Sequence, residues 1–374
     1  MSSKAQVQVT FHWIYVVLAG AVILLFFAGM VVRQKSVAEK ELTSEVVRIM
    51  ESILAGAGVS EKTKNVIDTS GLADLALYFS CTEGVGEFGI LDGSSRAQNA
   101  RDPLFAPQVI KSPQLVAWSL PYAFPFKVID FLYVTAPTIK YAVFSLNPSN
   151  DLFDDFEEEF RDVGNVVRLQ TPDAYASLAS EEYFHVRVVT DVADLHLQSV
   201  PLQLRSLDDE EVSLVELLEE KAVYYQKKGT MWQQRGEVEI FSLGNGDDFS
   251  DGMGDSSAKD PAVFAAIFAG TPEQYRCNMQ KALWRLELLV PLYQKKEERL
   301  EWHYIGEGES TGTCMNFLTS NSARKNIEDT LTHLKESAEG CRRGSAGSCT
   351  ELIAVARELR ILNKEMGLDC IPLY

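Results

Sequence analysis

The most apolar stretch of the chain lies near its amino terminus. It runs from Phe11 to Val32, reads FHWIYVVLAGAVILLFFAGMVV, and has His12 as its only ionisable side chain. As a helix it would cover about 33 Å, enough to cross a hydrocarbon core. Trp13 and Tyr15 lie near its start, where amphipathic rings favour a membrane interface. The pattern therefore predicts a single transmembrane helix with the lipid bilayer as its partner.

Beyond this stretch the helical period continues but becomes amphipathic. Apolar side chains recur at helical spacing, acids largely occupy the other faces, and Gly56 and Gly58 should end the helix. The apolar stripe consists of Leu42, Val46, Ile49, Met50 and Ile53. Because such a stripe needs cover, we predict a stalk helix over residues 36–58 that packs on the chain's own folded part, on other copies or on envelope proteins.

Short runs of β-branched and aromatic residues follow, and they alternate with helical patterns. The expected strands are residues 126–134, 140–146, 165–169, 185–190 and 237–243. The expected helices are residues 151–162 and 208–226. Strands that alternate with helices predict β-α-β units and a mainly parallel sheet, hence a Rossmann-like or flavodoxin-like α/β domain. Residues 60–125 form its irregular lead-in, with a strand-like run at 75–79, and the proline-rich stretch 115–126 is either a buried connector or a partner surface.

The last hundred residues show helical periodicity. Thr271 and Pro272 combine an N-cap with proline at the first helical position, and Pro291 should kink the helix that follows. Three helices are expected. The first begins after Thr271, the second runs from about residue 322 to Gly340, and the third runs from Ser348 to Gly367. Helices joined by short links pack antiparallel.

Six cysteines occur, five of them in the last hundred residues. No C-x-x-C pair occurs and no cysteine has a histidine at short ligand spacing, which favours disulfides over a zinc site, with free thiols as a further alternative. With antiparallel helices, the loop after the first helix lies near the chain end. This geometry suggests the pairs Cys314–Cys370, Cys341–Cys349 and Cys81–Cys277.

The flanking charges and the cysteines give opposite indications about topology. Arg33, Lys35 and Lys40 follow the apolar stretch and Lys4 precedes it, so a positive-inside count places the large domain in the cytoplasm. An even number of cysteines is typical of an oxidising exterior. We expect a single-pass protein of the cell membrane with its large C-terminal domain outside the cytoplasm.

The sequence Ser3-Lys4-Ala5-Gln6 directly precedes the apolar helix. It resembles the class III signal peptide of archaeal type IV pilins, which a prepilin peptidase cleaves before a glutamine. The resemblance covers about the first fifty residues and implies processing between Ala5 and Gln6. In that family the apolar half of the first helix packs into a filament core and the amphipathic half lies under the head domain, which implies a pilin-like role in assembly.

Composition and charge narrow the classes of function. A net charge of −18 without a basic stripe argues against a nucleic-acid partner. A length of 374 residues favours several folded units. We predict an α/β fold class with an N-terminal transmembrane helix and stalk, a Rossmann-like or flavodoxin-like α/β domain and a C-terminal helical subdomain with disulfides. The expected boundaries are 1–35, 36–58, 59–270 and 271–374.

Candidate chemistry is sparse. No glycine-rich phosphate loop follows the second expected strand, and neither H-E-x-x-H nor G-x-S-x-G occurs. The loop 244–255 holds four aspartates, but EF-hand spacing places Phe249 and Ala258 at ligand positions, so an acidic surface loop is favoured over a calcium site. Asp191 and Asp194 follow the strand 185–190, where either catalytic or capping roles occur.

These patterns favour a non-enzymatic role without a cofactor or metal. We expect an anchored, extracytoplasmic module for adhesion, assembly or cell-envelope structure that is pilin-like at its amino terminus. The alternative is an exported α/β enzyme or small-ligand-binding domain with an unrecognised site. A deep, polar pocket at the strand ends would favour the alternative.

Overall fold

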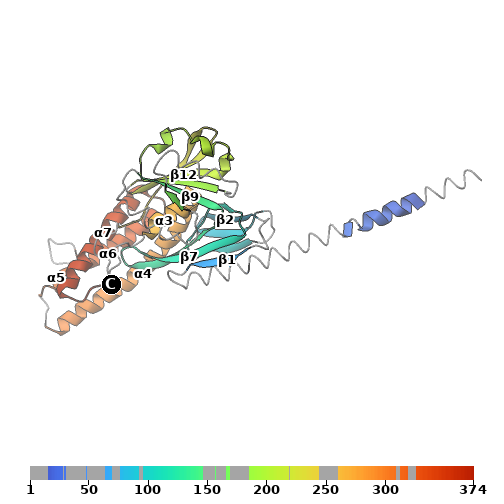
Figure 1. The fold of residues 1–374 in the computed structure, drawn as a ribbon. Helices are drawn as coiled ribbons and strands as arrows, with labels where there is room; N and C mark the ends of the chain where they lie inside the picture. Colours follow the sequence, from blue (N-terminus) through green and yellow to red (C-terminus); the bar gives the residue numbers. More distant parts are fainter. Residues whose placement is uncertain are drawn as a thin grey trace, which may run out of the picture.

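The computed structural model describes residues 16–27, 29–30, 48, 64–69, 76–91, 96–145, 156, 166–168, 185–218, 220–243, 260–308, 312–318 and 326–374. The predicted processing site, almost all of the stalk and the acidic loop 244–255 lie outside these residues. So does the expected helix 151–162, apart from its buried Phe156. Three β-sheets and a layer of helices make up the folded body (Figure 1).

Two four-stranded sheets are formed by the first part of the body. Their strand orders are β1-β7-β8-β5 and β4-β3-β2-β6, and every pair is antiparallel except β5 with β8. The strands are β1 (Asn65–Asp68), β2 (Leu77–Thr82), β3 (Val85–Ile90), β4 (Arg96–Asn99), β5 (Leu104–Phe105), β6 (Val109–Ile110), β7 (Gln114–Ala123) and β8 (Lys127–Thr135). The predicted irregular lead-in is therefore wrong, and its proline-rich stretch is mostly the buried strand β7.

A six-stranded sheet follows, in the order β10-β9-β11-β12-β13-β14. Strands β10, β9, β11 and β12 are parallel, and β13 and β14 continue the sheet antiparallel. The strands are β9 (Ile139–Phe144), β10 (Val166–Arg168), β11 (His185–Thr190), β12 (Val212–Leu218), β13 (Lys221–Lys228) and β14 (Met231–Glu239). The chain passes from β9 to β10 on one side and returns to β11 on the other, so the strand order reverses between β9 and β11.

The helix predicted for residues 208–226 is wrong, because this segment is the β12–β13 hairpin. The acids that suggested a helix start form the short 3₁₀ helix η5 (Asp209–Glu211), where Asp208 and Glu211 make a capping box. Strand β12 is buried on both faces, with Val215 in one core and Leu214 in another. Such a strand lacks the alternation of apolar and polar residues that identifies a strand with one exposed face. Its sequence therefore cannot be distinguished from that of a buried helix by periodicity.

The predicted fold class is also wrong. Parallel pairing among the described strands is confined to β10, β9, β11, β12 and the short β5–β8 pair, which is not a Rossmann-like or flavodoxin-like domain. No helix in the described part of the chain is long and apolar enough to cross a membrane. The lipid contact expected between Phe11 and Val32 stays a prediction.

Five α-helices follow or flank the sheets in the described residues. They are α3 (Pro261–Phe268), α4 (Pro272–Gly306), α5 (Met315–Leu318), α6 (Ile327–Arg342) and α7 (Ala346–Asp369). The predicted start of α4 is confirmed, since the Thr271 side chain accepts a hydrogen bond from the Gln274 amide at 3.2 Å. Helix α6 continues past Gly340, where a side chain would collide with Ser348 of α7. The glycine at position 340 is therefore accounted for by the close packing of α6 on α7, and it does not mark the end of a helix.

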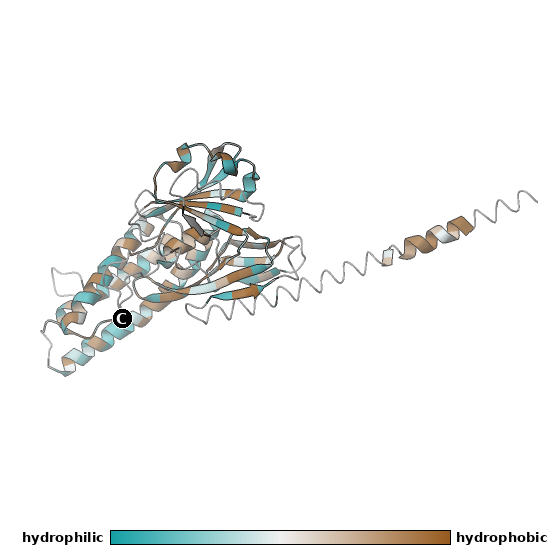
Figure 2. Ribbon diagram, viewed as in Figure 1, coloured by the Kyte–Doolittle hydropathy of each residue, from teal (hydrophilic) through white to brown (hydrophobic). Residues whose placement is uncertain are grey.

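The main core lies between the two four-stranded sheets, one face of the six-stranded sheet and the helices. Helix α3 is its centre: it contacts β7, β8 and β12, and Phe268 packs on the rings of Trp118 and Tyr133. A smaller core covers the opposite face of the six-stranded sheet, under η3 (Leu195–Leu197) and η4 (Leu202–Leu204). Figure 2 shows apolar residues in the strands that face these cores and in the helical residues 16–27.

Three disulfides cross-link the body, and they are the three pairs suggested by the sequence. Cys81 of β2 joins Cys277 of α4, which ties an antiparallel sheet to the longest helix. The others are Cys314–Cys370, which joins the segment before α5 to the end of α7, and Cys341–Cys349, which joins α6 to α7.

Candidate functional site

The carboxyl ends of β9 and β11 meet where the strand order reverses. Phe144 and Thr190, the last residues of the two strands, are paired in register. The next residues are Ser145 and Asp191, and the Ser145 hydroxyl donates a hydrogen bond to Asp191 Oδ2 at 2.8 Å. In open sheets with parallel strands, this is the position at which ligands bind.

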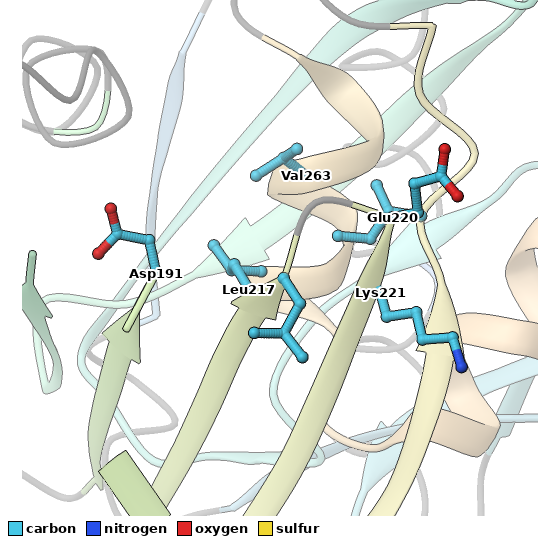
Figure 3. A pocket seen from close by; sticks show the side chains of 7 residues that line it. Asp191, Leu217, Glu220, Lys221 and Val263 are labelled. Carbon is cyan, nitrogen blue, oxygen red and sulfur yellow. The ribbon is translucent and has the colours of Figure 1, made fainter. Parts of the chain in front are cut away.

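A cavity of about 730 Å³ opens beside this point. Its lining combines four apolar side chains with two carboxylates and one lysine (Figure 3). The lining residues are Asp191, Leu217, Leu218, Glu220, Lys221, Ile240 and Val263. Asp191 lies on one side of the cavity and Glu220 and Lys221 lie on the other, with Leu217 between them (Figure 3). The cavity lining is mainly apolar, whereas a deep, polar pocket is the feature expected from the sequence for an exported α/β enzyme or small-ligand-binding domain.

The charges opposite Asp191 already have partners. Glu220 lies 3.2 Å from Arg357 of α7, and Lys221 lies 3.5 Å from Glu237 of β14. All four side chains are at least 44% exposed, so these ion pairs add little to stability. They place two opposite, mutually cancelling charges at that side of the cavity.

The structure separates the two aspartates that the sequence singles out. Asp191 lines the cavity, whereas Asp194 does not. Asp194 precedes η3 in the left-handed region, at φ 66°, and its side chain makes no capping hydrogen bond there. The capping role expected for Asp194 is therefore not seen.

Sequence reasoning missed a hydrogen-bonded cluster around Glu216, the residue of β12 that precedes the cavity-lining Leu217. The Glu216 carboxylate is 2% exposed and accepts hydrogen bonds from the His196 backbone amide at 2.7 Å and from the Tyr225 hydroxyl at 3.2 Å. His196 Nδ1 lies 3.0 Å from Glu216 Oε1, and the imidazole stacks on the Tyr225 ring. Burial, and then the Glu216 charge, raise the pKa of Tyr225, so the phenol stays protonated.

This cluster fastens η3 to the sheet. Glu216 satisfies an amide, an imidazole and a phenol that cover the outer face of β12 and β13, as a buried carboxylate requires. The sequence signal was a single glutamate inside the apolar run VSLVELL. Because the sequence predicted a helix over residues 208–226, Glu216 was not singled out.

Arg187 on β11 is a second buried charge with a structural role. It is 2% exposed, and its guanidinium donates to the carbonyl groups of Ile267 and Ala269 at 2.6 and 2.7 Å and to Ser213 Oγ at 3.1 Å. Burial lowers its pKa. The side chain therefore caps the carboxyl end of α3, where helix carbonyl groups lack partners.

Helix α4 carries exposed apolar side chains on the face that turns away from its core. Between 47% and 67% of each of these side chains is exposed, and lysines and arginines lie among them. The residues are Trp284, Leu288, Leu292 and Trp302, with the cations Arg285, Lys295, Lys296 and Arg299. Their spacing of four residues, and of about five turns from Trp284 to Trp302, places them along one side of the helix. We call this set the α4 face.

The α4 face differs in charge from the rest of the chain. It presents four cations in a protein with a net charge of −18, and Glu298 flanks it, 3.9 Å from Lys295. Exposed tryptophan beside arginine is typical of protein interfaces, where these residues supply most of the binding energy. An apolar face with basic edges suits an amphipathic, acidic partner.

Neither a family model nor a curated protein nor a solved structure matches this chain. Within the described residues, no group of three or more histidine, cysteine, aspartate or glutamate side chains has the geometry of a metal site. The case for function therefore depends on the α4 face and on the cavity at the strand ends.

Proposed function

We propose that this protein is a non-enzymatic assembly module of an oxidising compartment outside the cytoplasm, and that its copies associate through the α4 face. The observation that carries this proposal is the row of half-exposed tryptophan and leucine side chains on α4, edged by cations. Exposed Trp284 and Trp302 have a large apolar area in water, which favours contact with another apolar surface.

The compartment is supported by the cysteines. All six are paired, and one disulfide joins residues 196 positions apart in the sequence. Glutathione and thioredoxin keep cytosolic thiols reduced, whereas paired cysteines persist in secreted and envelope proteins.

The occupant of the α4 face in this proposal is the amphipathic segment 36–58 of a second copy. The sequence of that segment has four glutamates against two cations and an apolar stripe from Leu42 to Ile53. The stripe would extend about 17 Å as a helix and the α4 face from Trp284 to Trp302 extends about 27 Å, so the face is long enough for the stripe. Charge sign and apolar character are complementary.

A single chain also leaves a second apolar surface uncovered. The large side chains of helical residues 16–27 are 52% to 71% exposed, and they directly precede the acidic segment. Contiguous exposed apolar surface of this kind marks a site of interaction with another protein or with a membrane. Its cover in this proposal is the lipid bilayer, which leaves the α4 face for association between copies.

The test is the oligomeric state of the full-length chain, measured by light scattering in mild detergent over a range of concentrations. We expect the wild-type chain to self-associate and the double variant Trp284→Ser, Leu288→Ser to dissociate at concentrations about thirtyfold higher or more, the effect of losing a hot spot worth about 2 kcal/mol. The matched control is Leu197→Ser, Leu202→Ser, which removes two leucines that are 68% and 75% exposed on the other side of the six-stranded sheet.

The control variant should associate like the wild type. A wild-type chain that is monomeric at all concentrations would contradict the proposal. Equal weakening by the α4 variant and the control would also contradict it, since general loss of exposed apolar surface would then explain the effect.

A further inference from the structure

The carboxyl end of α6 borders the α4 face. The side-chain amide of Gln280 donates a hydrogen bond to the Arg342 carbonyl at 3.5 Å, and the Arg342 guanidinium donates to both carboxylate oxygens of Glu287 at 2.6 and 3.3 Å. Trp284 follows Gln280 by four residues and precedes Glu287 by three, so it lies on the adjoining side of α4. Helices α4 and α6 lie side by side (Figure 1). Arg342 is therefore next to the Trp284 end of the α4 face.

The charges of Glu287 and Arg342 cancel at this border. Their side chains are 14% and 32% exposed, so solvent screens the pair only in part. The hydrogen bond to Glu287 raises the pKa of Arg342. Without Arg342 beside it, Glu287 would present a negative charge at the edge of a face that, in the proposed function, receives an acidic segment. Like charges at the edge of an interface oppose association.

The position of Arg342 depends on the turn between α6 and α7. Arg342 is the last residue of α6, and the last turn of a helix frays because its carbonyl groups lack helical partners. Cys341, directly before it, forms a disulfide with Cys349 of α7. Between them, residues 343–347 are exposed, and the Gly344 amide donates to the Cys341 carbonyl at 2.9 Å. The disulfide is thus the covalent link that holds the end of α6, and with it Arg342, in place.

The disulfide can be reached from solvent at one of its two residues. Cys349 is partly exposed, whereas Cys341 is 6% exposed. A thiolate of a dithiol reductant attacks the Cys349 sulfur, the bond between the two cysteines breaks, and Cys341 leaves as a thiolate that takes up a proton. The second thiol of the reductant then displaces Cys349. The products are two cysteine thiols and the disulfide of the reductant, so two electrons pass to the protein.

We infer that the Cys341–Cys349 disulfide is a redox switch of the α4 face. The oxidised form holds Arg342 on Glu287 and permits association. Reduction by a dithiol releases Arg342, leaves the Glu287 charge unpaired beside Trp284 and weakens association. This inference rests on the proposed function, because it concerns the regulation of that same face.

The test is the self-association constant of the full-length chain, measured by sedimentation velocity for the wild type and for Cys341→Ser, Cys349→Ser, which represents the reduced state. We expect the disulfide variant to associate about fivefold more weakly, the effect of one unpaired charge at the edge of an interface. Addition of Glu287→Gln to both chains should reduce this difference to about twofold or less, since no carboxylate is then left unpaired.

The matched control is Cys314→Ser, Cys370→Ser. Ile371, which follows this second disulfide, contacts the buried side of α4 by donating to the Tyr304 hydroxyl at 2.8 Å. The control should associate like the wild type, although its disulfide spans 56 positions of the sequence instead of 8. Amide hydrogen exchange at residues 339–343 should accelerate in Cys341→Ser, Cys349→Ser and stay unchanged in the control, also in dilute samples.

The outcomes separate this inference from the proposed function. A wild-type chain that is monomeric at all concentrations overturns both. An associating wild type whose association constant does not change on loss of Cys341–Cys349 overturns the inference alone. Equal weakening by the two disulfide variants, weakening that persists with Glu287→Gln, or unchanged exchange at residues 339–343 also overturns it, because a general loss of stability or another contact would then be responsible.

Discussion

The carboxylate of Glu216 lies 3.0 Å from Nδ1 of His196, on the face of the six-stranded sheet opposite α3. Glu216 stands beside Thr190 in the parallel register, and both are almost fully buried. A buried carboxylate with three hydrogen-bond donors fixes the segment that crosses over it. The relationship joins η3 to β12 across 20 positions of the sequence.

Replacement of Glu216 tests this role. Glu216→Gln keeps one acceptor oxygen for the His196 amide but places an amide donor where Oε2 accepts from the Tyr225 hydroxyl, so we expect a loss of about 1–3 kcal/mol in the free energy of unfolding. Amide hydrogen exchange should accelerate at residues 195–198. Glu210→Gln, an exposed glutamate in η5, is the control and should change neither. Unchanged exchange in Glu216→Gln would mean that the apolar contacts of η3 suffice.

Replacement of Arg187 tests the cap on α3. Arg187→Met leaves the carbonyl groups of Ile267 and Ala269 without their donor, so we expect a loss of about 2–4 kcal/mol in the free energy of unfolding. Arg205→Met also removes a guanidinium that donates to a backbone carbonyl group, but from an exposed position, and should cost about 1 kcal/mol or less. The free energies of unfolding are measured by urea denaturation. Equal losses in Arg187→Met and Arg205→Met would contradict the role of Arg187 as the cap of α3.

Glu297 on α4 makes stability depend on pH. Burial, and then the charges of Glu328, Glu301 and Glu298, raise its pKa to about 7. In the unfolded chain the group ionises near its usual value of about 4.3. The folded state therefore binds more protons between these values, and this residue's contribution to stability falls as the pH rises from about 4 to 7.

Glu297→Gln should remove this dependence. We expect the variant to match the wild type near pH 4 and to exceed it by about 1–2 kcal/mol at pH 8, a value reduced for partial solvation. Chemical denaturation at the two pH values measures the difference. Glu351→Gln, at an exposed position of α7, should show no such change. A variant that is less stable than the wild type at pH 8 would contradict the pKa assignment.

The disulfides should differ in their effect on stability. Cys81 and Cys277 close a loop of 196 positions, whereas Cys341 and Cys349 close one of 8. Loop entropy gives about 5 kcal/mol for the first and about 2.5 kcal/mol for the second. Paired Cys→Ser variants compared by urea denaturation should show this order. Equal losses would indicate that residual structure in the unfolded chain dominates.

Local patterns predicted much of the helical part from sequence. The Thr271 cap identified the start of α4, and antiparallel helices brought Cys314 near Cys370. Strands β8, β9 and β11 were found because their β-branched runs end at turn residues. These features depend on residues close together in sequence or on simple helix geometry.

Features that depend on burial were missed. Strand β12 is covered on both faces, so its continuous apolar run gave no alternating signal. The contact of His196 with Glu216 joins residues 20 positions apart and follows from the crossing of η3, which no local pattern indicates. The α4 face was visible as Trp284, Leu288 and Leu292 at helical spacing, but only the structure shows that nothing in the described residues covers them.

Association through the α4 face is the central claim, and a charge-reversal cycle tests it most directly. The self-association constant is measured by sedimentation velocity for the full-length chain, for Lys295→Glu, Arg299→Glu, for Glu41→Lys, Glu45→Lys, and for all four changes together. We expect each double variant to weaken association about tenfold or more and the fourfold variant to recover most of it, because opposite charges again face each other. Additive weakening in the fourfold variant would show that these residues do not meet and would contradict the claim.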